Sequence, residues 1–147
     1  MDNVTITKIL SRHSKTAKCF LGCYPSDSIP DSDVYPFAAI INTDKTGYPG
    51  KHWVAIYVPN KNTIEYFDSF GELPNANIGR YLLKFENIHM NKSIIQSLLS
   101  NVCGNYCIYF VIKRCCKNPY KKILKKLNGL SNPDAYVRRF VYDLEKV

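Results

Sequence analysis

The stretch HWVAIYVPNKNTIEYFDSF, residues 52–70, decides the expected fold. Two apolar runs, residues 52–58 and 63–70, flank the short polar break PNKN, and this pattern predicts a β-hairpin. The β-branched run FAAIINT, residues 37–43, predicts a buried strand before it. An ionisable side chain at the start of an apolar strand needs a partner or a function, so His52 marks the place where a site is expected.

The expected partner of His52 is Asp68. If the hairpin centres on Asn60, His52 lies opposite Asp68, and directly opposed residues point to the same side of a sheet. A shift of one residue would place Trp53 there instead, and the loop length does not determine the register. A carboxylate beside an imidazole fixes its tautomer and stabilises its charged form. We therefore expect these two side chains to act as a base and its orienting acid.

The expected nucleophile is Cys103, in the segment SNVCGNYCIYF that begins an apolar helix. Ser100 or Asn101 is expected to cap this helix, which places Cys103 in the first turn, where the helix dipole favours a thiolate. Gly104 has no side chain to obstruct a substrate. The amide of Gln96 is expected to join the backbone N–H of Cys103 in binding an oxyanion.

The rest of the chain predicts an α+β fold. The strands follow one another through short turns, so the central sheet is expected to be mixed or antiparallel and to be flanked by helices. Residues 20–33, rich in Pro, Asp and Ser, predict an ordered loop. The predicted helices cover residues 4–12, 81–86, 102–117, 119–127 and the segment from Pro133, and residues 87–90 predict a short strand. We expect residues 1–147 to form a single domain.

Composition supports a globular, monomeric protein. Of 147 residues, 46% are hydrophobic and 22% are charged, which is ordinary for a folded domain. No stretch has the length of a signal peptide core or a membrane span, so an intracellular protein without a membrane partner is expected. Thiols stay reduced in that compartment, so the six cysteines are not expected to pair, and Cys107 is expected to lie in the core.

The formal net charge of +8 is concentrated in one region. Residues 113–126 contain seven Lys or Arg side chains and no acid. A basic segment of this kind favours a polyanion, and DNA bound through Lys113–Lys126 is the expected partner. A solvated helix face explains the same pattern equally well.

Three segments, in chain order, resemble the adenovirus protease, adenain, and the wider clan of Ulp-type SUMO proteases. They are FLGCYPSDSIP (20–30), FAAIINTDKTGYPGKHWVAIYVPNKNTIEYFDSFG (37–71) and CGNYCIYFV (103–111). The combination of His-Trp, the acid in FDSFG and Gln followed by Cys-Gly is specific. The resemblance extends from about Phe20 to Pro119 and implies a cysteine protease of a virus or a virus-like mobile element.

The resemblance also implies a papain-like, two-part arrangement with the nucleophile at a helix N-terminus. The implied roles are catalytic for His52, Asp68 and Cys103, oxyanion-binding for Gln96, and substrate-binding for Trp53 and Gly104. The implied substrates are viral capsid or core precursors cleaved at small, glycine-containing sites, in the host nucleus or the virion. No metal or cofactor is required by the sequence, and DNA or a viral peptide is an implied activator. Residues 84–86 lack the cysteine to which the activating peptide of adenovirus proteases is joined.

Three alternatives remain open. The same catalytic residues would serve a deconjugase of ubiquitin-like modifiers, although a short chain offers little surface for a modifier. The basic segment would suit a nucleic-acid-binding protein with an inactive site. A metal site built from Cys19-x₃-Cys23, Cys103-x₃-Cys107 and Cys115-Cys116 is the least favoured, because zinc ribbons use a two-residue spacing.

Overall fold

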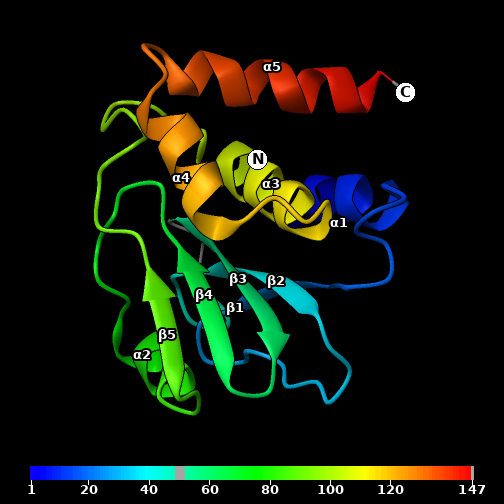
Figure 1. The fold of residues 1–147 in the computed structure, drawn as a ribbon, viewed down its shortest axis with the longest axis vertical. Coiled ribbons are helices and arrows are strands. Elements are labelled where there is room, and N and C mark those ends of the chain that lie inside the picture. Colours follow the sequence, from blue (N-terminus) through cyan, green and yellow to red (C-terminus); the bar gives the residue numbers. More distant parts are fainter. Residues whose placement is uncertain (49–51, 147) are drawn as a thin grey trace.

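Five strands form one mixed sheet in the computed structural model, which describes residues 1–48 and 52–146 (Figure 1). In chain order they are β1 (Phe20–Pro25), β2 (Phe37–Asn42), β3 (Trp53–Asn60), β4 (Thr63–Phe67) and β5 (Asn87–Met90), and the order in the sheet is the same. The two central pairings are antiparallel, and the outer pairs β1–β2 and β4–β5 are parallel. The predicted α+β class with a mixed sheet is confirmed.

Helices cover both faces of this sheet. They are α1 (Asn3–Arg12), α2 (Ala76–Leu82), α3 (Cys103–Cys115), α4 (Tyr120–Asn128) and α5 (Pro133–Glu145). In Figure 1, α1, α3, α4 and α5 lie together on one side, and α2 lies beside the lower end of β5. Within residues 1–48 and 52–146, no helix combines the length and the apolar character that crossing a bilayer requires.

The central strands are buried on both faces, which explains their nearly continuous apolar sequences. Along β2, Ala38 and Ile40 pack against the helical layer, whereas Ala39 and Ile41 pack into a second cluster with α2. Alternation of this kind follows from the two-residue period of a strand. The sheet is therefore a fixed platform on which the ends of β3 and β4 can hold side chains in place.

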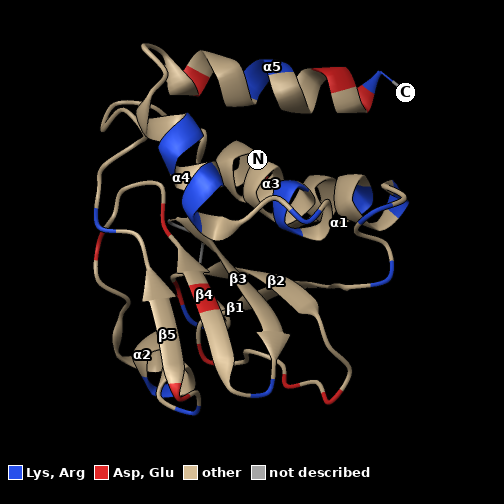
Figure 2. Cartoon of the chain, viewed as in Figure 1, with Lys and Arg blue, Asp and Glu red and all other residues tan. Residues whose placement is uncertain are grey.

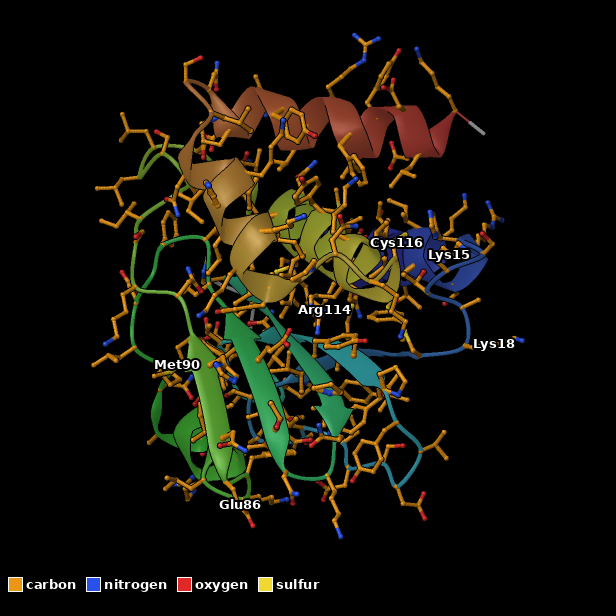
Figure 3. All side chains as sticks on the ribbon, in the orientation of Figure 1. Lys15, Lys18, Glu86, Met90, Arg114 and Cys116 are labelled. Atoms are coloured by element: carbon orange, nitrogen blue, oxygen red, sulfur yellow. The ribbon has the colours of Figure 1, made fainter. Side chains whose placement is uncertain are left out.

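A buried ion pair joins α3 to the sheet. Arg114 points from α3 toward the strands (Figure 3) and donates from Nε and Nη2 to the two carboxylate oxygens of Glu65, at 2.6 and 2.9 Å. Its guanidinium also lies 4.3 Å from the centre of the Tyr57 ring. Because the bidentate geometry sets both distance and angle, this contact helps to define how α3 lies over β3 and β4.

Two predicted segments are wrong in type or position. The expected loop at 20–33 begins with β1, because parallel pairing with β2 supplies hydrogen bonds that the Pro- and Ser-rich sequence does not reveal. The expected helix at 81–86 ends at Leu82 and starts earlier. Its start is at Ala76, because the Asn75 side chain accepts from the N–H of Ile78 and caps it.

Candidate active site

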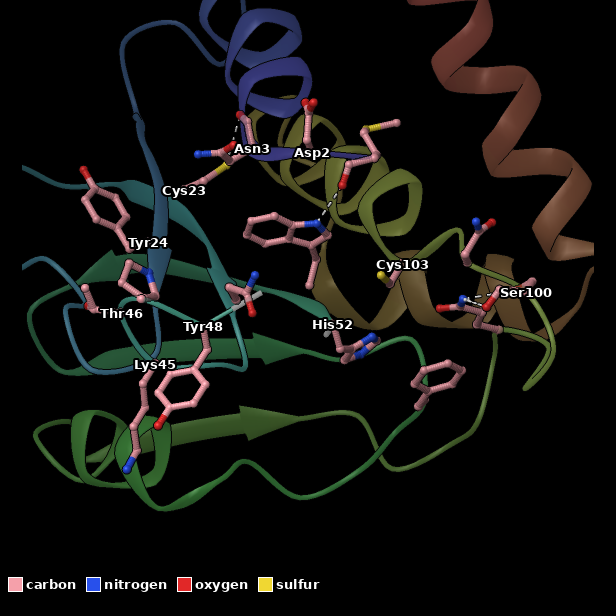
Figure 4. A pocket seen from close by; sticks show the side chains of 18 residues that line it. Asp2, Asn3, Cys23, Tyr24, Lys45, Thr46, Tyr48, His52, Ser100 and Cys103 are labelled. Carbon is pink, nitrogen blue, oxygen red and sulfur yellow. Dashed lines mark hydrogen bonds between the residues drawn. The ribbon is translucent and has the colours of Figure 1, made fainter. Parts of the chain in front are cut away.

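A cleft of about 770 Å³ opens where α3 begins beside the ends of β3 and β4 (Figure 4). Its walls come from the start of α1, the end of β1 and the segment that follows β2. The side chains that bear on chemistry are His52, Trp53, Phe70, Gln96, Ser100 and Cys103. Strands, two helices and several loops thus meet at one opening.

Asp68 and His52 form a short hydrogen bond in this cleft. The distance from His52 Nε2 to Asp68 Oδ1 is 2.6 Å, and both side chains are largely buried. The same oxygen accepts from the backbone N–H of Phe70 at 2.9 Å. The Asn91 side chain forms two hydrogen bonds with the Asp68 backbone: Oδ1 accepts from the N–H at 3.0 Å, and Nδ2 donates to the carbonyl at 2.6 Å. The carboxylate is therefore held in one orientation, as an orienting group requires.

The predicted hairpin register is wrong by two residues. The ladder pairs Ala55 with Phe67, and an irregularity follows Tyr57. Continued outward, this register sets Phe70 opposite His52, and the two rings stack with centroids 4.7 Å apart. Asp68 reaches the imidazole because the chain turns sharply after β4. Phe70 lies within the segment FDSFG, and the sequence pattern alone predicts no role for it.

The thiol of Cys103 and the imidazole of His52 are coupled. Burial lowers the pKa of His52, but hydrogen bonds and negative charge from Asp68 and Cys103 raise it more, to about 9. Burial raises the pKa of Cys103, while hydrogen bonds from His52 and the Trp53 backbone N–H, with the His52 charge, bring it below its ordinary value. Because Asp68 engages Nε2, Nδ1 is the ring nitrogen left to interact with the thiol. Both shifts favour the thiolate of Cys103 and the imidazolium of His52 over the neutral pair.

Gln96 is buried, and its amide is held on both sides. Its Oε1 accepts from the Ser69 hydroxyl at 2.6 Å, which directs Nε2 away from Ser69. Nε2 donates to the carbonyl and the hydroxyl of Ser100, both at 3.1 Å. The Ser69 carbonyl accepts from the backbone N–H groups of Ile95 and Gln96. Gln96 lines the cleft with its donors toward the start of α3, and Ser69 is a residue that sequence analysis missed.

The expected cap of α3 is wrong. The N-cap is Val102, without a side-chain hydrogen bond. The Ser100 hydroxyl is used elsewhere, donating to the Ser97 carbonyl and accepting from Gln96. At this end of α3 no side-chain oxygen caps the helix, and the backbone N–H of Gly104 helps to lower the pKa of Cys103.

The N-terminal residue forms a wall that sequence analysis missed. Trp53 lines the cleft, as expected, and its indole N–H donates to the Met1 carbonyl at 3.0 Å. Gly104 is buried, and a Cβ placed on it would lie 3.3 Å from Cβ of Met1 and 3.5 Å from Cδ1 of Ile6. The missing Cβ of Gly104 therefore leaves room for Met1 and Ile6, and the expected contact of Gly104 with substrate stays a prediction.

The other cysteines do not assemble a metal site. Within residues 1–48 and 52–146, which include all six cysteines, no group of three or more His, Cys, Asp or Glu side chains is placed to hold a metal ion. Cys107 is fully buried, and burial raises its pKa well above the ordinary value, as its predicted core position implies.

A thiol at the start of a helix, an imidazole, a carboxylate and a side-chain amide in one cleft define a site of the cysteine-protease class. Comparison with known proteins leads to the same class. Residues 27–127 match the Ulp1 protease family, C-terminal catalytic domain. The chain belongs to this family, and the resemblance to the Ulp-type clan is confirmed.

Two similar proteins are viral proteases. The chain is 32% identical over 127 residues to a protein of Acanthamoeba polyphaga mimivirus that carries the name thiol protease, covering 79% of this chain and 41% of the relative. It is 30% identical over 91 residues to a cysteine protease of African swine fever virus, covering 53% and 33%. The crystal structure of the pS273R protease has a TM-score of 0.69 at 18% identity, covering 94% of this chain and 65% of that chain, so the fold is shared. The chain spans less than half the length of these curated relatives.

Proposed function

We propose that this domain is a cysteine endopeptidase that cleaves precursors of viral structural proteins. One observation carries the proposal: Cys103 and His52 line the same cleft, the thiol and the imidazole shift each other's pKa, and Asp68 holds the imidazole through a 2.6 Å hydrogen bond. The viral origin of the relatives supports a task in the infected cell or the particle. The preference for glycine near the scissile bond rests on the family resemblance.

In the proposed mechanism the Cys103 thiolate attacks the carbonyl carbon of a peptide bond. The oxyanion receives hydrogen bonds from Gln96 Nε2 and the first N–H groups of α3. Gln96 Nε2 now donates to the Ser100 hydroxyl, and a charged oxyanion is the better acceptor for the same N–H. His52 gives its Nδ1 proton to the leaving amine, which leaves an acyl-enzyme. His52 then removes a proton from water, and the hydroxide releases the acyl group and restores the thiol.

The test is cleavage of capsid-type peptides with glycine at the scissile bond. Cys103→Ala and His52→Ala should abolish turnover, and Gln96→Ala should lower kcat by about 10²–10³-fold. Cys116→Ser is the matched control, because Cys116 is exposed at the far end of α3, and it should retain full activity. Turnover by folded Cys103→Ala protein would refute the assignment. A peptide aldehyde or vinyl sulfone should modify Cys103.

A deconjugase is the second candidate, and one observation favours it. African swine fever virus relatives that are 29% identical over 91 residues carry the name SUMO-1 cysteine protease. The same variants should be offered linear fusions of ubiquitin-like modifiers beside the peptides. A kcat/KM at least about tenfold higher for one modifier fusion than for the peptides would select deconjugation. The reverse ratio would select the endopeptidase.

We also propose that DNA binds the basic region and activates the enzyme. A cavity of about 560 Å³ is lined by Lys113 of α3 and by Lys122, Lys125 and Lys126 of α4. Figure 2 shows this concentration of positive charge on α4. Among the described residues, none of those lining the cavity is acidic. Lys122 and Lys125 are exposed on α4, while Lys113 lies 5.6 Å from the Tyr109 ring centre and Lys126 lies 5.4 Å from the Tyr136 ring centre.

Fluorescence titration with duplex DNA over a range of salt tests this part. Replacing Lys122 and Lys125 together by Ala should weaken binding and reduce the slope of log K against log salt by about 2. Lys8→Ala in α1 is a control that should leave the slope unchanged. An equal slope in the double variant, or cleavage rates that DNA does not alter, would contradict the proposal.

A further inference from the structure

Two cysteines that lie far apart in the sequence meet away from the cleft. Cys19 lies directly before β1, and Cys115 is the last residue of α3. Their Sγ atoms are 2.6 Å apart, although 96 positions separate them in the chain. Both residues are half-buried. Neither takes part in the proposed catalytic chemistry.

Both backbones are anchored at this point. The N–H of Cys19 donates to the Thr16 carbonyl, and its carbonyl accepts from the N–H of Ala38 in β2. Cys115 lies in the last turn of α3, one residue after Arg114, which is tied to the sheet through Glu65. The closeness of the sulfur atoms therefore follows from two fixed elements.

The surroundings make the two thiols unequal. The hydrogen bond from the Cys115 thiol lowers the pKa of Cys19 more than burial raises it, and the charge of Lys117 adds to the lowering. The same hydrogen bond, in which either sulfur can be the donor, raises the pKa of Cys115 together with burial. These opposite shifts favour Cys19 as the attacking thiolate and Cys115 as the resolving thiol.

We propose that Cys19 and Cys115 form a modification site that oxidises to a disulfide with a low-molecular-weight disulfide such as glutathione disulfide. The Cys19 thiolate attacks one sulfur of glutathione disulfide, whose S–S bond breaks, and one glutathione leaves and takes a proton. The Cys115 thiol loses its proton and attacks the Cys19 sulfur of the mixed disulfide, releasing the second glutathione. Two protein thiols are oxidised, and one glutathione disulfide is reduced to two glutathiones.

This disulfide joins β1 to the end of the helix that begins with the nucleophile. Cys103 lies about 18 Å from Cys115 along α3, so the bond does not consume the catalytic thiol. The bond closes a loop containing all five strands, and it restricts the unfolded chain more than the folded one. The oxidised domain should therefore be the more stable form, for example in a particle outside the reducing cell.

The experiment uses the full chain with Cys103→Ala, so that reaction at the nucleophile does not interfere and the outcome does not depend on the proposed protease function. Incubation with glutathione disulfide should reduce the free thiols from five to three. Proteolysis that includes cleavage after Phe20 separates Cys19 from Cys23, and mass spectrometry should find Cys19 joined to Cys115. Oxidation should raise Tm by about 5–10 °C.

Cys115→Ser in the same background should abolish both the linked peptide and the rise in Tm. Cys116→Ser is the matched control, because it removes the neighbouring thiol, and it should retain both. Five free thiols after incubation, or linkage through Cys23 or Cys116 instead, would overturn the proposal. So would an oxidised protein whose Tm equals that of the reduced protein. If Cys115→Ser fails to fold, mass-spectrometric mapping of the linked peptide in the Cys103→Ala protein, which retains Cys19 and Cys115, still decides the test.

Discussion

The charge of Asp68 should control how reactive Cys103 is. Asp68→Asn removes that charge but preserves the side-chain shape, so an oxygen can still accept from the N–H of Phe70. The pKa of His52 rises from its ordinary 6.5 to about 9, and Asp68 is the leading group that raises it against burial. At about 1.4 kcal/mol per pKa unit, the folded site stabilises the imidazolium by ~3 kcal/mol.

If Asp68→Asn removes about 2–3 kcal/mol of this stabilisation of the imidazolium, the population of the thiolate–imidazolium pair falls by about 30- to 150-fold. The assay is the second-order rate of alkylation of Cys103 by iodoacetamide between pH 6 and 10, followed by mass spectrometry of its peptide. Near pH 6–7 the variant should react more slowly by this factor. Near pH 10 the two proteins should converge, because the thiol then ionises without help from His52.

Asp143→Asn is the matched control, since Asp143 pairs with Arg139 on the exposed face of α5 and should leave the profile unchanged. Circular dichroism and Tm establish that the Asp68 variant is folded. If folded Asp68→Asn protein alkylated at the unsubstituted rate at pH 6–7, the reasoning that Asp68 stabilises the charged imidazole would be refuted.

Three further outcomes follow from the geometry. Gly71→Ala should destabilise the fold by about 2 kcal/mol in urea unfolding, because φ is +64° and a Cβ would lie 2.6 Å from the Ser93 carbonyl oxygen; an unchanged midpoint would contradict this. Glu65→Ala should cost about 3–5 kcal/mol, since it leaves Arg114 buried without its carboxylate, and Arg114→Leu added to it should recover part of the loss. Peptide cleavage should decline on the alkaline side with an apparent pKa near 9, as His52 loses the proton that the leaving amine needs, and a flat profile to pH 10 would exclude that role.

Local chemistry was sufficient to select the central residues of the site. Cys103 begins an apolar helix, and His52 and Asp68 stand at the ends of two strands, so each is marked by its position in a short segment. Gln96 was selected through the resemblance as well as by its distance from Cys103. The structure brings His52, Gln96 and Cys103 to the same cleft and places Asp68 in a hydrogen bond with His52.

Other features could not be read from short segments. The hairpin register depends on the pairing of Asn60 with Thr63 and on an irregularity after Tyr57; it differs by two residues from a pairing centred on Asn60 and places Phe70 on His52. The strand β1 forms because its backbone hydrogen-bonds to β2. Met1 and Trp53, which both line the cleft and are hydrogen-bonded to each other, are 52 positions apart in the chain. In each case the deciding partner is remote in the chain.

The sequence by itself determined the α+β class, the central strands, the main helices and the chemical identity of the thiol, imidazole and carboxylate, because hydrophobic period and residue type act locally. Only the tertiary structure decided which atoms meet: the clamp of Ser69 on Gln96, the contact of Gly104 with α1 and the pairing of Cys19 with Cys115. Each of these contacts joins segments far apart in the chain, and its geometry is set by how α1 and α3 pack on the sheet and where its loops run, which local preferences do not encode.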